Sequence, residues 1–158
     1  MSEPIDTSRT PTFNHIAMSV PADLLDEKGR DDLLRFYGEV FGWTEMPMMT
    51  EDRVRLVLRA YSNEQFVYLI ADADPMRCPQ MDHFGMSVGT PQELYDMAER
   101  ARKFQEGDPR VEIKEPEVED FKVVKLHNFY VRFLVPMMIE VQCFDWARGV
   151  DASSLPDQ

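Results

Sequence analysis

A short motif that occurs twice is the feature of this sequence that most constrains its fold. The segment NHIAMSV begins at Asn14, and DHFGMSV begins at Asp82, a shift of 68 residues. Four of the seven positions are identical, and one of them is a histidine, His15 in the first copy and His83 in the second. An internal match of this kind predicts two copies of one structural unit.

The residues that follow each copy repeat the same order of patterns. Apolar residues at helical spacing fill 33–41 in the first half and 94–104 in the second, where the segment 90–93 (TPQE) is a capping box. Gly42 and Gly107 are the expected helix ends. The period then changes from 3.6 to 2, which predicts strands at 53–59, 66–70, 111–113, 121–135 and 138–144. The acidic run EPEVED that follows Lys114 predicts a solvated loop.

Each half therefore has the order strand, helix, strand, strand, strand. We predict an α+β fold of two tandem βαβββ modules, at about 13–72 and 81–146, within one domain at 13–146. The total of 158 residues also suits a single domain. The ends of the chain, 1–12 and 147–158, are rich in Ser, Pro and Asp and are predicted to be flexible tails.

The charge of the chain narrows its possible partners. Seventeen basic and twenty-nine acidic residues give a net charge of −12, which repels phosphate backbones and anionic lipids. We therefore expect no nucleic-acid partner and no membrane partner. The sequence contains no apolar run of bilayer-spanning length and no signal-peptide pattern, and Cys78 and Cys143 are too few for a disulfide framework. The expected location is the cytoplasm.

Alternation along the repeated strand places each histidine beside small residues. The larger apolar residues, which are expected to contact the helices, are Ile16, Met18, Val20, Phe84, Met86 and Val88. The opposite face carries His15 or His83, followed at every second position by alanine, glycine or serine. Two symmetric histidines beside open space are typical of a metal site.

The last predicted strand supplies a third candidate ligand. Glu140 lies on the face opposite Ile139 and Val141. An ionised carboxylate in so apolar a strand is costly unless it is paired or binds a cation. Aligning 66–69 with 138–141 places Tyr68 at the matching position of the first half.

These features resemble the vicinal oxygen chelate superfamily, which includes glyoxalase I, extradiol dioxygenases and bleomycin-resistance proteins. The resemblance covers about 13–146 and rests on the duplicated histidine strand, the FYGEVFGW helix end and the closing IEV strand. It implies a curved mixed sheet around a central cleft, where His15, His83 and Glu140 bind one divalent metal ion. Fe(II), Mn(II), Zn(II), Ni(II) and Co(II) all suit this ligand set. The resemblance also implies a homodimer, and leaves open whether the modules pair within one chain or across two.

The resemblance implies a divalent-metal-dependent enzyme of glyoxalase or dioxygenase type. Its substrate would be a small molecule that chelates the metal ion through vicinal oxygens, and its reaction would be that of a dioxygenase or of a lyase or isomerase. Glu140 would also serve as a base, and Tyr68 would act as a hydrogen-bond donor or acid–base group, or else as a wall residue. Tyr68 replaces the fourth ligand of classic glyoxalase I, which argues against that activity. The alternative is a metal-free protein that sequesters an aromatic natural product or antibiotic, as bleomycin-resistance proteins do.

The strands that form the cleft also supply candidate substrate contacts. Arg132 is suited either to bind an anionic group or to form a structural ion pair. His127 alternates with the core-side residues of its strand, so we expect it to face the core. The full set of predicted substrate contacts is Phe66, Tyr130, Arg132, Gln142 and Phe144.

Overall fold

The structure, a computed structural model, describes residues 11–150 and consists of two modules with the same order of elements. The first module contains β1 (His15–Val20), α1 (Glu27–Phe41), β2 (Thr44–Glu45), β3 (Arg55–Arg59) and β4 (Phe66–Ala71). The second contains β5 (His83–Ser87), α2 (Pro91–Gly107), β6 (Glu112–Asp120), β7 (Val124–Arg132) and β8 (Met138–Trp146). Two short 3₁₀ helices, η2 (Ala22–Leu25) and η3 (Pro47–Met49), belong to the first module. Most of the predicted tails lie outside the described residues.

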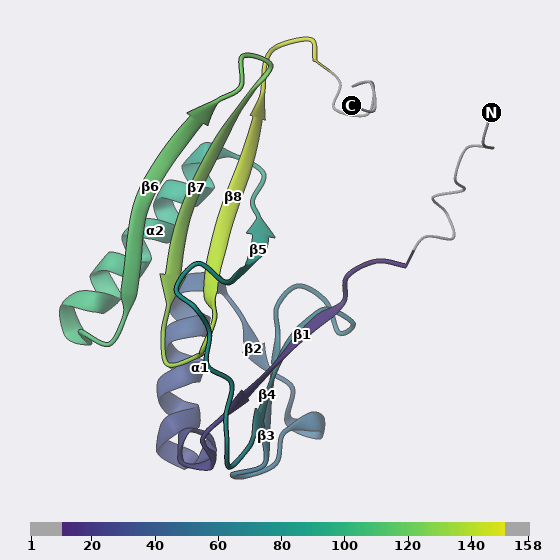
Figure 1. The fold of residues 1–158 in the computed structure, drawn as a ribbon, viewed down its shortest axis with the longest axis vertical. Coiled ribbons are helices and arrows are strands. Elements are labelled where there is room, and N and C mark those ends of the chain that lie inside the picture. Colours follow the sequence, from purple (N-terminus) through teal and green to yellow (C-terminus); the bar gives the residue numbers. More distant parts are fainter. Residues whose placement is uncertain (1–10, 151–158) are drawn as a thin grey trace.

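Each module forms its own four-stranded mixed sheet (Figure 1). The strand orders are β1-β4-β3-β2 and β5-β8-β7-β6, so the first strand of each module lies at a sheet edge, parallel to the last. The registers also match, because Ala17 lies opposite Tyr68 and Gly85 lies opposite Glu140. The prediction of tandem βαβββ modules is confirmed, with two open sheets that are not joined to each other.

Both helices end at the predicted glycines, and α2 also begins at the predicted capping box, whereas the start of α1 at Asp26 was not predicted. The Asp26 carboxylate accepts a hydrogen bond from the Gly29 amide at the start of α1, and Gly42 ends this helix in the left-handed conformation (φ 73°). At the start of α2, Thr90 and Glu93 form the predicted capping box. Neither of these helices, nor any other in the described part of the chain, is long and apolar enough to cross a bilayer.

The acidic run at 115–120 was predicted to be a loop, and this prediction is wrong. These residues belong to β6, which pairs with β7 on both sides of an irregularity at 115–116. Because β6 is an edge strand, its carboxylates stay in water and cost little. Pro116 is tolerated because the register shifts between Lys114 and Glu117. Pairing with a long neighbouring strand therefore overrides the preference of these acidic residues for a loop.

A single hydrophobic core joins the two modules. The ring of Phe36 in α1 packs against Phe133 at 4.8 Å and against Phe104 of α2 at 5.1 Å between centroids. The Tyr37 hydroxyl donates a hydrogen bond of 3.0 Å to the Phe133 carbonyl, and the Arg100 guanidinium donates two to the Val40 carbonyl. These contacts fix how the two sheets lie relative to each other.

An ion-pair network at the same junction adds a pH-dependent contribution. Arg110 donates to Asp108 at 2.6 Å and reaches Asp32 of α1 at 3.0 Å. The hydrogen bond from Arg110 is the main reason why the pKa of Asp108 falls to about 2. Asp108 is well buried, so this interaction is less screened by solvent than an exposed pair.

We expect the free energy of unfolding to fall by about 2 kcal/mol as the pH drops from about 5 to about 2, with Asp108 as a major contributor. The folded-state pKa is depressed, so the stabilisation is complete above the unfolded pKa of 3.8 and is lost as the pH falls through about 2. Urea denaturation at both pH values measures the decline. Asp108→Asn is expected to make the unfolding free energy depend less on pH over this range. Asp23→Asn, at an exposed position, is the control. An unchanged decline in Asp108→Asn would contradict the assignment.

Candidate functional site

The open face of the second sheet brings Glu140, His83 and Tyr130 together. Glu140 of β8 is only 6% exposed, and one of its oxygens, Oε2, lies 3.2 Å from Nε2 of His83 on the neighbouring strand β5. The Tyr130 hydroxyl of β7 donates a hydrogen bond of 2.8 Å to the other oxygen, Oε1. Three adjacent strands thus supply one cluster around a buried carboxylate.

The hydrogen bonds of this cluster leave Nε2 of His83 and Oε2 of Glu140 facing each other. Nδ1 of His83 lies 2.8 Å from the Met81 carbonyl, which can only accept, so Nδ1 carries the proton. Nε2 is therefore the ring nitrogen that faces the Glu140 carboxyl group. A proton shared by Nε2 and Oε2 satisfies this pair, and so does a cation bound to both atoms. Gly85 lies opposite Glu140, and a Cβ added there would contact nothing within 4 Å, so space is available beside the pair.

Tyr130 serves this cluster as a neutral donor. Burial raises the pKa of Tyr130 to about 12, and the hydrogen bond to Glu140 and its negative charge add to this effect. The hydroxyl therefore keeps its proton at neutral pH. The sequence predicted Tyr130 as a substrate contact, and the structure places it against a candidate metal ligand.

His15 occupies the equivalent position on the other sheet. Its Nδ1 lies 2.8 Å from Oδ1 of Asn14, its Nε2 has no hydrogen-bond partner among residues 11–150, and its ring stacks on Phe66 at 4.9 Å. Tyr68 has the register position that Glu140 has in the second sheet. Within residues 11–150, no three His, Cys, Asp or Glu side chains lie close enough together to hold a metal ion. One chain thus brings His83 and Glu140 together, without His15.

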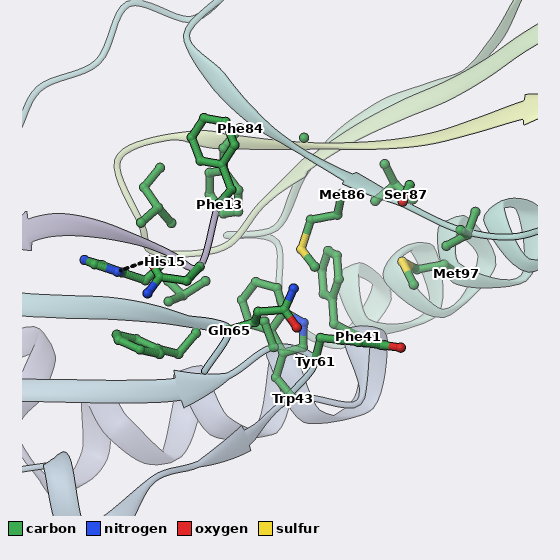
Figure 2. Close-up of a pocket in the computed structure, with 18 residues that line it drawn as sticks. Phe13, His15, Phe41, Trp43, Tyr61, Gln65, Phe84, Met86, Ser87 and Met97 are labelled. Carbon is green, nitrogen blue, oxygen red and sulfur yellow. Dashed lines mark hydrogen bonds between the residues drawn. The ribbon is translucent and has the colours of Figure 1, made fainter. Parts of the chain in front are cut away.

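A separate apolar cavity of about 620 Å³ lies between the edges of β1 and β5 (Figure 2). Its wall includes side chains on the helix-facing side of these strands and on the helices themselves, mainly Ile16, Phe41, Trp43, Phe84, Met86 and Met97. His15 lies at its rim, whereas neither His83 nor Glu140 lines it. The cavity is large enough for a small apolar molecule.

The remaining predicted residues have different surroundings. Arg132 donates to Glu112 at 2.7 Å and to the Pro136 carbonyl, so it forms a structural ion pair. Gln142 and Phe144 lie beyond Glu140 on the same face of β8, and Phe144 is 48% exposed. His127 faces α2, where Nδ1 lies 3.1 Å from the Tyr95 hydroxyl, in agreement with its predicted core side.

Sequence reasoning missed the partners that orient the two histidines. Asn14 precedes His15 directly, so its position in the motif was an available signal. The partner of His83 is a backbone carbonyl, that of Met81, which has no signature in the sequence. Trp146, which stacks on Phe144, could have been found by extending the alternation of β8 by two residues.

No protein-family model and no curated protein sequence matches this chain. Solved structures do match in fold. Lactoylglutathione lyase from Agrobacterium tumefaciens has a TM-score of 0.59 at 13% identity, over 85% of this chain and 94% of that one. A fosfomycin resistance protein from Listeria monocytogenes has a TM-score of 0.56 at 13% identity, over 85% and 93%. A glyoxalase/bleomycin resistance protein from Albidiferax ferrireducens has a TM-score of 0.56 at 15% identity, over 83% and 98%. The chain has the fold of the vicinal oxygen chelate superfamily.

Proposed function

We propose that this chain is a cytoplasmic, divalent-metal-dependent enzyme of the vicinal oxygen chelate superfamily, with one domain at 13–146. Its substrate is a small molecule that binds the metal ion through two vicinal oxygens. The observation that supports this proposal is the close approach of His83 and Glu140, whose Nε2 and Oε2 atoms lie 3.2 Å apart. Divalent ions such as Fe(II), Mn(II), Zn(II), Ni(II) or Co(II) prefer such nitrogen and oxygen ligands.

The third ligand, His15, is proposed to come from a second copy of the chain. The core and the Arg110 network hold the two sheets of one chain in a fixed arrangement, so bringing His15 to His83 within one chain would require this junction to break. A homodimer avoids that cost, because the first module of each copy then faces the second module of the other. Each dimer would contain two equivalent sites.

The chain's own residues would act on the substrate through proton transfer and orientation. The metal ion, when bound, supplies a Lewis acid that polarises the substrate oxygens. Glu140 is held in place by the Tyr130 hydroxyl at Oε1. Oε2, which is proposed to bind the metal ion, would accept a proton from the substrate after it detaches from that ion. Tyr68, at the matching position of the first sheet, would donate a hydrogen bond to a substrate oxygen. This arrangement suits lyase or isomerase chemistry, and open metal positions also suit a dioxygenase.

A second candidate function rests on the apolar cavity. A protein that sequesters an aromatic natural product would use a cavity lined by aromatic and methionine side chains, and the cavity between β1 and β5 has such a lining. The net charge of −12 favours a cationic ligand. This function needs no metal ion, so metal content distinguishes the two candidates.

Mixing two inactive variants tests the proposed shared site. His15→Ala and His83→Ala each remove one ligand from both sites of a homodimer. In a mixed dimer, one site loses both histidines, and the other regains the complete set. We expect stoichiometric Zn²⁺ binding in wild type, weak binding in each variant alone, and one tightly bound ion per mixed dimer.

Elemental analysis of tagged, co-refolded dimers provides the readout. Absence of tight binding in the mixed dimer would contradict the shared site. Absence of Zn²⁺, Mn²⁺ and Fe²⁺ binding in wild type would contradict metal dependence and favour the sequestering protein.

A further inference from the structure

The open face of the second sheet continues well beyond the candidate metal ligands. Successive rows across β7 and β8 pair Tyr130 with Glu140 and then Asn128 with Gln142. The next two rows pair Leu126 with Phe144, and Val124 with Trp146. β5 pairs only with Met138–Gln142, so the last two rows lie on the part of β7 and β8 that extends past β5 (Figure 1).

These last two rows form an apolar strip, defined as Val124, Leu126, Phe144 and Trp146. The rings of Phe144 and Trp146 stack with centroids 6.1 Å apart and planes 17° apart. Phe144 remains 48% exposed, although it lies in line with the buried Glu140. A flat aromatic surface that adjoins a chelating site is suited to bind a planar apolar group.

We infer that the substrate carries a planar apolar group that lies on this strip while its vicinal oxygens reach the metal ion near Glu140. The inference rests on the proposed function and adds the substrate class to it. Phe144 is four residues beyond Glu140 on the same strand, which corresponds to about 13 Å at 3.3 Å per residue. The substrate is therefore elongated, with a chelating end and an apolar end.

The charges around the strip disfavour an anionic end of the substrate. Lys114 pairs with Glu117 at 3.6 Å, and Arg132 pairs with Glu112, so both cations of β6 and β7 on this face are engaged. Glu119 lies opposite Leu126 and has no ion-pair partner among residues 11–150. A carboxylate at the far end of the substrate would meet this negative charge.

Two hydroxamates of different length test the inference on Zn²⁺-loaded protein. Both chelate metal ions through two oxygens, but acetohydroxamate ends at its methyl group, whereas ω-phenylhexanohydroxamate places a ring about 12 Å away, close to the separation given by strand geometry. Isothermal titration gives the dissociation constant of each. We expect the longer probe to bind more tightly. A carboxylate on its ring is expected to weaken binding about two- to fivefold, and Glu119→Gln is expected to remove that difference.

Phe144→Ala tests whether the longer probe binds at the strip rather than at other apolar surfaces of the protein. We expect this variant to bind the longer probe about two- to tenfold more weakly and acetohydroxamate unchanged. Val118→Ala is the control, because Val118 has nearly the same exposure, 49%, and lies in the row of His127 on the other face of the sheet. It is expected to leave both constants unchanged.

Equal effects of Phe144→Ala and Val118→Ala, or none, would overturn the inference. A shift of the dimer equilibrium by Phe144→Ala without a change in probe affinity would also overturn it, because a second copy would then cover the strip.

If acetohydroxamate fails to bind metal-loaded protein, the proposed function fails instead. In that case ω-phenylhexanamide, which has no chelating group, is titrated while the Trp146 indole resonance is observed. A shift supports the strip as an apolar site, and no shift overturns it.

Discussion

Glu140→Ala is expected to weaken divalent-metal binding more than about 100-fold, because it removes a proposed ligand and leaves His83 as the one proposed ligand on the second sheet. Loss of an outer partner alone typically costs 10- to 100-fold, and loss of a ligand costs more. Competition with a chromophoric chelator measures the affinity for Zn²⁺ in both proteins.

Tyr68→Phe is the matched control, because Tyr68 has the same register position in the first sheet. This variant is expected to keep stoichiometric metal, since Tyr68 is not a proposed ligand. Equal metal loss in the two variants would show that the ligand set is larger than His15, His83 and Glu140. Unchanged affinity in Glu140→Ala would remove Glu140 from the set.

Phe133→Ala is expected to lower the free energy of unfolding by about 3–5 kcal/mol, the usual cost of truncating a fully buried phenylalanine. Phe133 is inaccessible to solvent and packs against Phe36 of the other module, so the cavity would form at the junction of the two halves. Chemical denaturation monitored by circular dichroism measures the loss.

Phe144→Ala provides the comparison, because it removes the same side chain from an exposed position. Its expected cost is below about 1 kcal/mol. Similar losses in the two variants would mean that Phe133 does not join the modules. A separate unfolding transition for each module in Phe133→Ala would support this joining role directly.

The internal repeat explains why so much of the fold could be predicted. The spacing of the two motifs fixed the equivalence of His15 and His83, and alternation placed both away from the buried Met18 and Val141. The capping box at Thr90 was predictable because its interactions are local. Such signals depend on residues near each other in the sequence.

The parts that could not be predicted depend on contacts between distant segments. The acidic residues of β6 form a strand because β7 supplies backbone partners on both sides of the register shift. The separation of His15 from His83 results from the core around Phe36 and Phe133, which lie 97 positions apart in the chain. Neither local propensity nor the histidine spacing contains this information.

The position of the core has a consequence for how such a chain can change. The large aromatic side chains that hold the modules together lie on the helix side of the sheets, whereas His83, Gln142 and Phe144 project from the opposite face. Substitutions at the exposed positions of that face, such as Phe144, leave the junction intact and cost little folding free energy. The chain can therefore alter the surface that a bound molecule would contact by a few replacements at exposed positions along β7 and β8, without first gaining stability elsewhere.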